Sequence, residues 1–215
     1  MDRLRISRAH FPVTVLGPGR RIGLWVQGCS LGCEGCISRD TWDSETGSEV
    51  AISELADWCA QCLIDGATGL TVSGGEPFQQ ATGLSLLLQT IRQVTKDTDF
   101  DILVYSGYSH RFLVKKFPKL LALIDAVVAE PYISHLAGGS WLRGSSNQQI
   151  HTFSKLGELR FGVSAQASEG GPSMQVAVSE KRIWYIGIPG PGDMERLEEI
   201  ARQRGVELGG ASWVA

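Results

Sequence analysis

The chain has 215 residues, of which 43% are hydrophobic and 20% charged, as expected for one globular unit with a substantial core. Its formal net charge of −3 gives no electrostatic basis for binding nucleic acid or an anionic membrane. No apolar run reaches the roughly 18 residues of a membrane span, and residues 1–5 lack the apolar region of a signal peptide. Five cysteines, three of them clustered, favour a reducing compartment, so we expect a cytoplasmic protein.

Hydrophobic patterning predicts alternating strands and helices up to residue 150. Strands are expected at residues 4–7, 11–16, 21–27, 69–73, 101–105 and 124–129, and helices at 49–64, 79–94 and 110–123. Continuously apolar strands that alternate with helices indicate parallel βαβ units. The units are too few for a closed eight-stranded barrel of about 250 residues, which favours a partial, laterally open barrel.

The pattern changes after residue 150, so we divide the chain into a core (residues 1–150) and a C-terminal extension (residues 151–215) packed on it. Strands are predicted at residues 159–163, 174–178 and 182–188, followed by a helix at 194–204 with Asp193 as its N-cap. The predicted fold class is therefore α/β, a partial (β/α) barrel with a short β-rich and helical extension.

Three cysteines, Cys29, Cys33 and Cys36, lie within eight residues in a C-x3-C-x2-C pattern. Three soft thiolate ligands on one short loop require a soft metal. Four cysteines would close a structural zinc or iron–sulfur site, whereas three leave a coordination position open, as reactive metal sites do. Gly32 and Gly35 give the loop the freedom to bring the three side chains to one object.

A glycine-rich tetrapeptide ends the predicted strand at residues 69–73: Gly74, Gly75, Glu76 and Pro77. Glycines at this point let a ligand approach the backbone, and a glutamate can lie near an ammonium group. Ser106 and Glu130 follow the next two predicted strands. Because ligand contacts gather at the carboxyl ends of strands, both are candidates for the same site, although each is equally well explained as a turn residue.

The cysteine loop and the tetrapeptide, in this order, resemble the radical S-adenosylmethionine (radical SAM) enzymes over about residues 20–150. In that family the cysteines hold three irons of a [4Fe–4S] cubane, SAM chelates the fourth iron, and the GGEP segment engages the SAM amino group. The resemblance implies Cys29, Cys33 and Cys36 as catalytic cluster ligands. It also implies SAM contacts at residues 74–77, with Ser106 and Glu130 as further candidates.

Finer features are similar to the activase branch of the family, which includes the activating proteins of anaerobic ribonucleotide reductases. These features are the Cys-Glu-Gly-Cys end of the loop (residues 33–36), Asp-Thr-Trp at residues 40–42 and the run at residues 142–148. The resemblance implies reductive cleavage of SAM to a 5′-deoxyadenosyl radical that installs a glycyl radical on a partner enzyme. It further implies an electron donor such as flavodoxin or ferredoxin. Gly35 departs from the wider superfamily, where the position before the last cysteine is often aromatic.

Two other functions stay open at this stage. One is a radical SAM enzyme that modifies a small molecule or peptide, with residues 151–215 building its substrate pocket. The other is an iron–sulfur electron carrier or a zinc module, neither of which needs a GGEP segment. Cys59 and Cys62 form a second C-x2-C pair within a predicted helix, but two ligands cannot hold another cubane, and we expect them to pack in the core.

Overall fold

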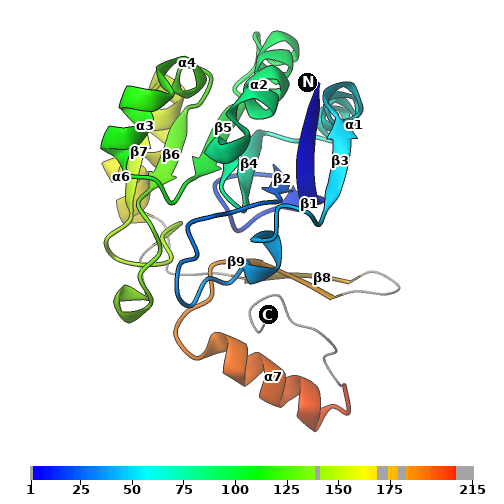
Figure 1. Cartoon of the computed structure of the whole chain (residues 1–215), viewed down its shortest axis with the longest axis vertical. Helices are drawn as coiled ribbons and strands as arrows, with labels where there is room; N and C mark the ends of the chain where they lie inside the picture. Colours follow the sequence, from blue (N-terminus) through cyan, green and yellow to red (C-terminus); the bar gives the residue numbers. More distant parts are fainter. Residues whose placement is uncertain (1, 139–140, 169–173, 179–182, 207–215) are drawn as a thin grey trace.

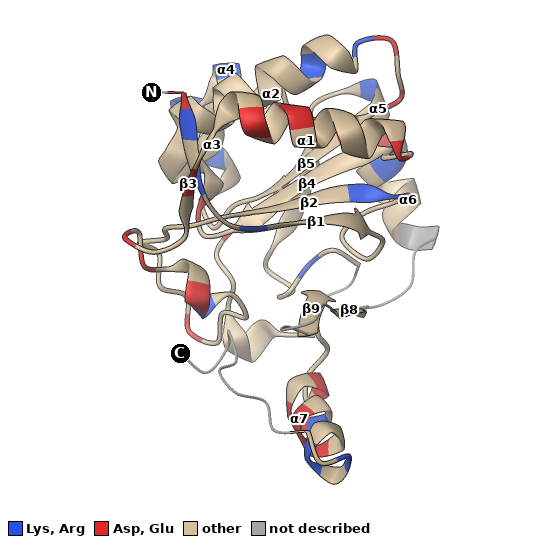
Figure 2. Ribbon diagram, turned by 90° about the vertical axis from the view of Figure 1, so that its right-hand side faces the viewer, with Lys and Arg blue, Asp and Glu red and all other residues tan. Residues whose placement is uncertain are grey.

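The computed structural model describes residues 2–138, 141–168, 174–178 and 183–206. These residues form a mixed α/β fold around one large sheet (Figure 1). Helices α1 and α2 cover one face of the sheet, and a two-stranded hairpin lies on the other face (Figure 2). Within the described residues, no helix is long and apolar enough to cross a membrane.

The large sheet has seven strands in the order β3-β1-β2-β4-β5-β6-β7. In chain order the strands are β1 (Arg3–Val13), β2 (Arg21–Val26), β3 (Ser48–Ala51), β4 (Gly69–Gly74), β5 (Asp101–Tyr105), β6 (Ala126–Ala129) and β7 (Gln149–Thr152). The central strands β2, β4, β5 and β6 are parallel, which confirms the predicted βαβ units. The outer strands pair antiparallel, and β7 continues the sheet past residue 150 by pairing with β6.

The helices connect these strands or follow them. They are α1 (Ile52–Ile64), α2 (Ala81–Val94), α3 (His110–Lys116), α4 (Pro118–Leu121), α5 (Lys155–Phe161), α6 (Val163–Ser168) and α7 (Asp193–Gln203). Single 3-10 turns lie at Arg39–Thr41, Pro77–Gln80 and Ser134–Leu136. Pro118 divides the helix expected at residues 110–123 into α3 and α4, because proline is tolerated in the first turn of a helix and not in its interior.

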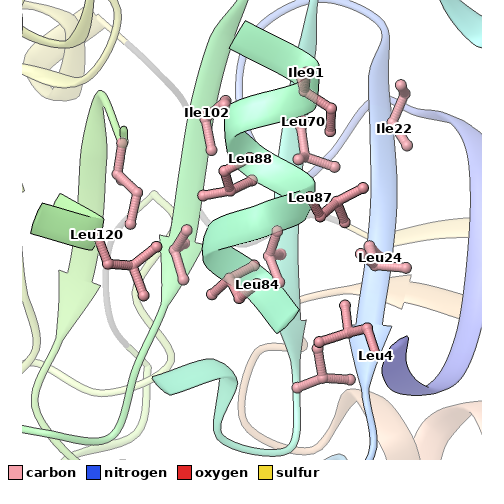
Figure 3. Packing of buried hydrophobic residues seen from close by; sticks show 14 of the residues in the cluster. Leu4, Ile22, Leu24, Leu70, Leu84, Leu87, Leu88, Ile91, Ile102 and Leu120 are labelled. Carbon is pink, nitrogen blue, oxygen red and sulfur yellow. The ribbon is translucent and has the colours of Figure 1, made fainter. Parts of the chain in front are cut away.

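The main core lies between the sheet and its helices. Four residues of α2 at helical spacing, Leu84, Leu87, Leu88 and Ile91, are buried against the parallel strands (Figure 3). Their neighbours on β2, β4 and β5 include Ile22, Leu70 and Ile102, each fully buried. Burial of each such side chain contributes about 1.5–3 kcal/mol. This packing fixes the strands whose carboxyl ends carry the predicted site.

We call the face of the large sheet opposite α1 and α2 the inner face. A buried ion network lies on this face, at the amino-terminal ends of the parallel strands. Arg21 at the start of β2 and Asp101 at the start of β5 are both fully buried, with 2.5 Å between Arg21 Nη2 and Asp101 Oδ1. Arg160 of α5 also pairs with Asp101, and Thr71 accepts from Arg21 Nε at 2.6 Å. Each buried charge thus has a partner, so this end of the fold is structural rather than reactive.

The hairpin formed by β8 (Met174–Val178) and β9 (Ile183–Gly187) packs on the inner face. Ile186 and Trp184 of β9 join Trp25 of β2 in an apolar cluster. The Gln175 side chain donates to the Pro12 carbonyl at 2.8 Å and accepts from the Thr14 amide at 2.9 Å. Figure 2 shows the hairpin on the side opposite α1 and α2, with α7 farther from the sheet. The hairpin therefore covers part of the inner face.

The strand predicted at residues 159–163 is wrong, since these residues fall in α5 and the start of α6. The sequence Leu-Arg-Phe-Gly-Val alternates apolar and other residues, which imitates a strand. In the structure Leu159 and Val163 are 76% and 79% exposed, and only Phe161 of the three apolar residues is buried. Ser154 caps α5 by accepting from the Gly157 amide at 2.9 Å, a local signal that favours the helix.

Three predicted boundaries also differ from the structure. One strand, β1, replaces the strands expected at residues 4–7 and 11–16, and it ends at Val13. The helix expected from residue 49 begins at Ile52 because residues 48–51 pair with β1. The N-cap of α7 is Gly192 rather than Asp193. Asp193 is instead the first helical residue, and its carboxylate accepts from the Gly190 amide at 2.8 Å.

Candidate functional site

The cysteine loop begins directly after β2, at the carboxyl ends of the parallel strands. Backbone hydrogen bonds hold it to the segment that follows, with 2.7 Å from the Gly28 amide to the Thr41 carbonyl and 3.0 Å from the Cys29 amide to the Trp42 carbonyl. The Cys36 amide turns back to the Cys33 carbonyl at 3.1 Å. All three thiols of the loop are free and partly exposed. The loop is therefore anchored at its ends while its sulfur atoms stay accessible.

Gly35 is required by the shape of this loop. Its backbone has φ +75°, a conformation that favours glycine. A Cβ at this position would lie 3.2 Å from Cβ of Ser134 and 3.4 Å from Cε1 of Tyr132. The side chain that the wider superfamily often carries before its last cysteine would thus meet Tyr132, which already fills this space.

The thiols suit a bound cluster better than a bare, charged state. Burial raises the pKa of Cys29 and of Cys33, and nearby negative groups such as Glu76 add to the effect. Bound iron supplies the positive charge that stabilises thiolates in such surroundings. Among the described residues, no three Cys, His, Asp or Glu side chains surround a single ion position. A cubane would hold its thiolates through different irons, so the three cysteines need not converge on one ion position.

The GGEP segment is hydrogen-bonded to the cysteine loop through the backbone. The Gly75 amide donates to the Val26 carbonyl at 2.8 Å, and the Glu76 amide donates to the Gly28 carbonyl at 2.9 Å. A Cβ on Gly75 would lie only 2.2 Å from the Gly28 oxygen. Glycine at position 75 is thus needed for contact with the cysteine loop itself, and the two predicted motifs form one unit.

Glu76 is buried and fully engaged by protein donors. Its carboxylate accepts from the Phe78 amide at 3.0 Å, the Ser106 hydroxyl at 2.9 Å and the Gly107 amide at 2.8 Å. Burial raises the pKa of Glu76 to about 7, against the opposing effect of these hydrogen bonds. The structure therefore joins two of the predicted site residues, Glu76 and Ser106, across β4 and β5.

Glu130 lies at the carboxyl end of β6 with φ +85°, an uncommon backbone conformation for a residue other than glycine. Its carboxylate accepts from the His110 amide at the start of α3, at 3.2 Å. Its carbonyl accepts from the Gln148 side chain at 3.1 Å. Glu130 thus links α3 to the loop after β6, and its side chain points to the helix rather than into the neighbouring cavity.

A cavity of about 470 Å³ lies beside the cysteine loop, between the inner face and the hairpin. Two of the predicted site residues, Cys36 and Gly74, line it. The other lining residues from the core include Arg8, Trp25, Ser73, Tyr105, Tyr132 and Gln148, and those from the extension include Met174, residues 184–192, Met194 and Glu195. The core and the extension therefore contribute opposite walls of one space.

Comparison with known proteins places this site in a family. Residues 15–151 match the family described as the 4Fe-4S single cluster domain. The chain belongs to this family, in its radical SAM activase branch. Anaerobic ribonucleoside-triphosphate reductase-activating proteins of Vibrio cholerae and Haemophilus influenzae are 37% and 32% identical to it over 151 and 154 residues. In both cases the match covers 67% of this chain and 96% of the relative.

A second kind of activase also matches. The pyruvate formate-lyase-activating enzyme of Staphylococcus aureus is 30% identical over 154 residues, which cover 68% of this chain and 61% of that enzyme. The match to the 4Fe-4S family ends at residue 151, before the hairpin begins at Met174. The hairpin wall of the cavity thus lies outside the part of the chain that defines the 4Fe-4S family match.

Two site residues of this 4Fe-4S protein could not be identified from the motifs. Tyr132 packs against Gly35, and its backbone hydrogen-bonds the Cys33 thiol. Gln148 accepts from the Gly144 amide at 2.9 Å and donates to the Glu130 carbonyl, which orders the loop that carries Tyr132. The resemblance of residues 142–148 to activating proteins was the only signal for this loop.

The second cysteine pair has no part in the site. Cys59 and Cys62 are both buried in α1, in the main core between helix and sheet. Burial raises the pKa of Cys59 to about 12, which keeps its thiol protonated and unreactive. This confirms the prediction that the pair packs in the core.

Proposed function

We propose that this protein is a radical SAM activase that installs a glycyl radical on a partner enzyme of the anaerobic ribonucleoside-triphosphate reductase kind. One observation carries the proposal. Three accessible thiols stand on a loop that is hydrogen-bonded to a GGEP segment at the carboxyl ends of parallel strands. Relatives of the same family are named as activating proteins of that reductase. The names of these relatives and this geometry support the same conclusion.

The residues have distinct roles in this proposal. Cys29, Cys33 and Cys36 hold three irons of a [4Fe–4S] cluster and leave the fourth for SAM. When bound, cluster and SAM supply a one-electron cleavage that yields methionine and a 5′-deoxyadenosyl radical, the species that takes a hydrogen atom from glycine. Residues 74–77 hold the SAM amino group beside the cluster loop. Ser106 and Glu130 remain predicted SAM contacts. In the structure the Ser106 hydroxyl donates to Glu76, and the Glu130 carboxylate accepts from the first amide of α3.

The fold supports a further proposal, that the sheet is the wall of a partial, laterally open barrel of the radical SAM type. Its four parallel strands bring their carboxyl ends to one edge, where the cluster and SAM would bind. In this view residues 1–150 provide the cluster and SAM sites. Residues 151–215 form an extension packed on that core, and its described hairpin lies across the open side.

The reaction also needs an electron donor and a reducing environment. A small redox protein such as flavodoxin or ferredoxin fits the need for single electrons at low potential. The five free cysteines support a reducing compartment such as the cytoplasm. We include both in the proposal.

A radical SAM enzyme that acts on a small molecule or peptide is the second candidate. The observation in its favour is the cavity itself, because a walled space of about 470 Å³ has the size of a small-molecule site. The same cavity must hold SAM, however, which leaves limited room for a second free ligand. We therefore rank the activase first.

The deciding experiment mixes anaerobically reconstituted protein, SAM and dithionite with the anaerobic ribonucleoside-triphosphate reductase encoded in the same genome. We expect 5′-deoxyadenosine and a doublet glycyl radical signal on the reductase in electron paramagnetic resonance spectra. Production of 5′-deoxyadenosine without a radical on the reductase would favour the small-molecule or peptide candidate. Failure to cleave SAM at all would leave the electron carrier and the zinc module as the remaining functions.

A further inference from the structure

Positive charge gathers on helices α3 and α4. The chain has six lysines, and three of them lie close together, at positions 115, 116 and 119. Arg111 precedes them in α3. Residues 102–124 contain no Asp or Glu, although the formal net charge of the chain is −3. Residues 111–119, which we call the basic segment, are therefore a cationic stretch in a chain that is acidic as a whole.

The four cations of the basic segment are exposed. Arg111 and Lys115 lie four positions apart on the side of α3 opposite the buried Leu113. Lys116 and Lys119 are exposed as well. None of the four forms an ion pair with a residue that the structure describes. Because these charges are not neutralised within the described fold, they produce a positive potential that attracts an anionic partner.

Apolar side chains lie among these charges. Phe112 and Val114 of α3 are 42% and 45% exposed. Aromatic side chains and arginine are enriched in protein interfaces, and polar residues form the rim around them. An exposed aromatic ring with cations around it has the composition of a docking surface, whereas a helix face that only contacts water needs no exposed phenylalanine.

The basic segment is connected to the cysteine loop through Tyr108 and Gln79. The ring centroids of Phe112 and Tyr108 are 4.7 Å apart. The Gln79 amide nitrogen donates to the Tyr108 hydroxyl at 3.2 Å and to the Ser30 hydroxyl at 2.6 Å. Ser30 directly follows the first cysteine of the loop and is exposed, as is Gly32. The segment therefore borders the loop where the loop is open to solvent.

This approach to the loop is separate from the cavity. Cys36, the inner face and the hairpin line the cavity, and none of residues 106–119 is among the described residues that do so. A protein bound at α3 would leave the cavity free for SAM and for the glycine of the reductase. Each cleavage of SAM consumes one electron, so a second approach to the same cluster is what an electron donor needs.

We propose that the basic segment docks a small acidic protein that donates single electrons to the cluster. The proposal rests on the activase function and assigns a surface to its electron donor. In this step the donor is oxidised by one electron, the cluster is reduced from [4Fe–4S]²⁺ to [4Fe–4S]⁺, and no bond forms or breaks. Opposite charges speed the encounter of donor and acceptor. Weak electron-transfer encounters bury less than about 1,200 Å² in total, which suits one short helix and its neighbours.

The rate of cluster reduction tests the proposal. Reconstituted full-length protein with SAM is mixed anaerobically with a reduced flavodoxin of strongly negative net charge, and the visible absorbance of the cluster is followed. Lys115→Glu should slow this reduction about threefold or more at low ionic strength, and added salt should narrow the difference. Photoreduced deazaflavin, a small uncharged reductant, should reduce the variant and the unaltered protein at the same rate.

The matched control is Lys96→Glu, which changes the net charge equally. Lys96 is 74% exposed and lies between α2 and the start of β5, at the opposite ends of the strands from the cysteine loop. This control should keep the rate with flavodoxin. Equal rates for the two variants would overturn the proposal. Slowing of Lys115→Glu that deazaflavin shares would also overturn it, because the effect would then lie in the cluster site.

Carbodiimide cross-linking tests the same surface without a substitution, since it joins a lysine amine to a carboxylate in contact with it. Mass spectrometry of the unaltered protein cross-linked to flavodoxin should find Lys115, Lys116 or Lys119 in the joined peptides. Links confined to other lysines would contradict the proposal. So would the absence of links under conditions in which the flavodoxin reduces the cluster.

Failure of the activase function and failure of the docking surface give different results. If the unaltered protein forms no radical on the reductase when deazaflavin supplies the electrons, the activase function fails whatever the basic segment binds. If the radical forms but Lys115→Glu keeps the rate with flavodoxin, the function stands and the docking surface is wrong. If Lys115→Glu instead lowers the radical formed per 5′-deoxyadenosine with deazaflavin, the segment binds the reductase, and its assignment to the electron donor is wrong.

Discussion

Gly75 shows how closely the two motifs depend on each other. The residue lets the backbone after β4 touch the backbone before Cys29. We expect Gly75→Ala to displace the cysteine loop, because its Cβ would lie 2.2 Å from the Gly28 oxygen. Iron and SAM binding should then fall together, which iron analysis and equilibrium dialysis with SAM would measure. Gly66→Ala, where a Cβ meets nothing within 4 Å but φ is +90°, should lower stability and keep both iron and SAM binding. A Gly75 variant with full iron content would contradict this interpretation.

The cysteines separate into two groups with different consequences. Replacing Cys29, Cys33 or Cys36 by alanine should remove most of the iron from anaerobically reconstituted protein, because a cubane with two thiolate ligands is poorly held. Cys62→Ala should lower stability through lost packing and keep its iron. Quantifying iron and acid-labile sulfide in each variant checks the prediction. Loss of the cluster in the Cys62 variant would mean that the ligands are misassigned.

His151 makes stability depend on pH. Burial lowers the pKa of His151, and the stacked ring of His110, whose centroid lies 3.7 Å from that of His151, lowers it further. Glu130 has a weaker, opposing effect on this pKa. The unfolded chain therefore takes up a proton near pH 6.5 more readily than the folded chain does. We expect the free energy of unfolding to fall as pH drops below about 6.5. Urea titrations at several pH values measure how steeply the free energy of unfolding changes with pH. His151→Phe should keep the ring stack and make this pH dependence weaker. An unchanged pH dependence would mean that other groups cause it.

At the scale of elements, the ion network on the inner face depends on Asp101. It pairs with Arg21 and with Arg160, which joins β2, β5 and α5. Asp101→Ala would leave Arg21 buried without a carboxylate, and we expect a loss of about 3–5 kcal/mol in the free energy of unfolding. Glu49→Gln, which removes an exposed ion pair with Arg5, should cost less than about 1 kcal/mol. Chemical denaturation measures the free energy of unfolding of both variants. If both lose a similar amount, the buried network contributes little to stability.

Element prediction succeeded where local pattern and packing agree. The strands at residues 101–105 and 174–178 were predicted with the bounds that the structure has, since apolar runs between turn residues fix them. The pattern failed where tertiary pairing decides. Of residues 149–152 only Ile150 is apolar, and the segment forms β7 by pairing with the edge of β6. Leu159 and Val163 alternate like strand residues but are exposed on helices.

For the site too, local motifs could be predicted, whereas residues placed by tertiary contacts could not. The spacing of the cysteines predicted a soft-metal site, and the family resemblance predicted the role of the GGEP segment, because both motifs are contiguous in sequence. Tyr132 and Gln148 act through contacts with residues about 100 and 18 positions away, at Gly35 and Glu130, which no local pattern records. The cavity was equally unpredictable, since one of its walls comes from residues 184–192.

For the whole molecule, the cluster should also be a folding ligand. The cysteine loop is hydrogen-bonded to the GGEP segment after β4 and contacts Tyr132 after β6, so a cluster bound on it would stabilise the folded state. Removing iron anaerobically with a chelator should lower Tm by several degrees, given that 1 kcal/mol shifts Tm by about 2–4 °C in a chain of this size. Circular dichroism melts of the same sample before and after chelation measure this. Equal Tm values would show that the cysteine loop binds its cluster without support from the fold.

The position of the hairpin after the large sheet in the sequence has a consequence for biosynthesis. Strands β8 and β9 follow every strand of the large sheet in sequence, so they leave the ribosome after the sheet is complete. During that interval the carboxyl ends of the parallel strands have no hairpin across them. Iron and sulfide delivered in that interval would meet Cys36 before the hairpin wall is in place. Once β9 has docked, the same cysteine lines a cavity that the hairpin helps to form.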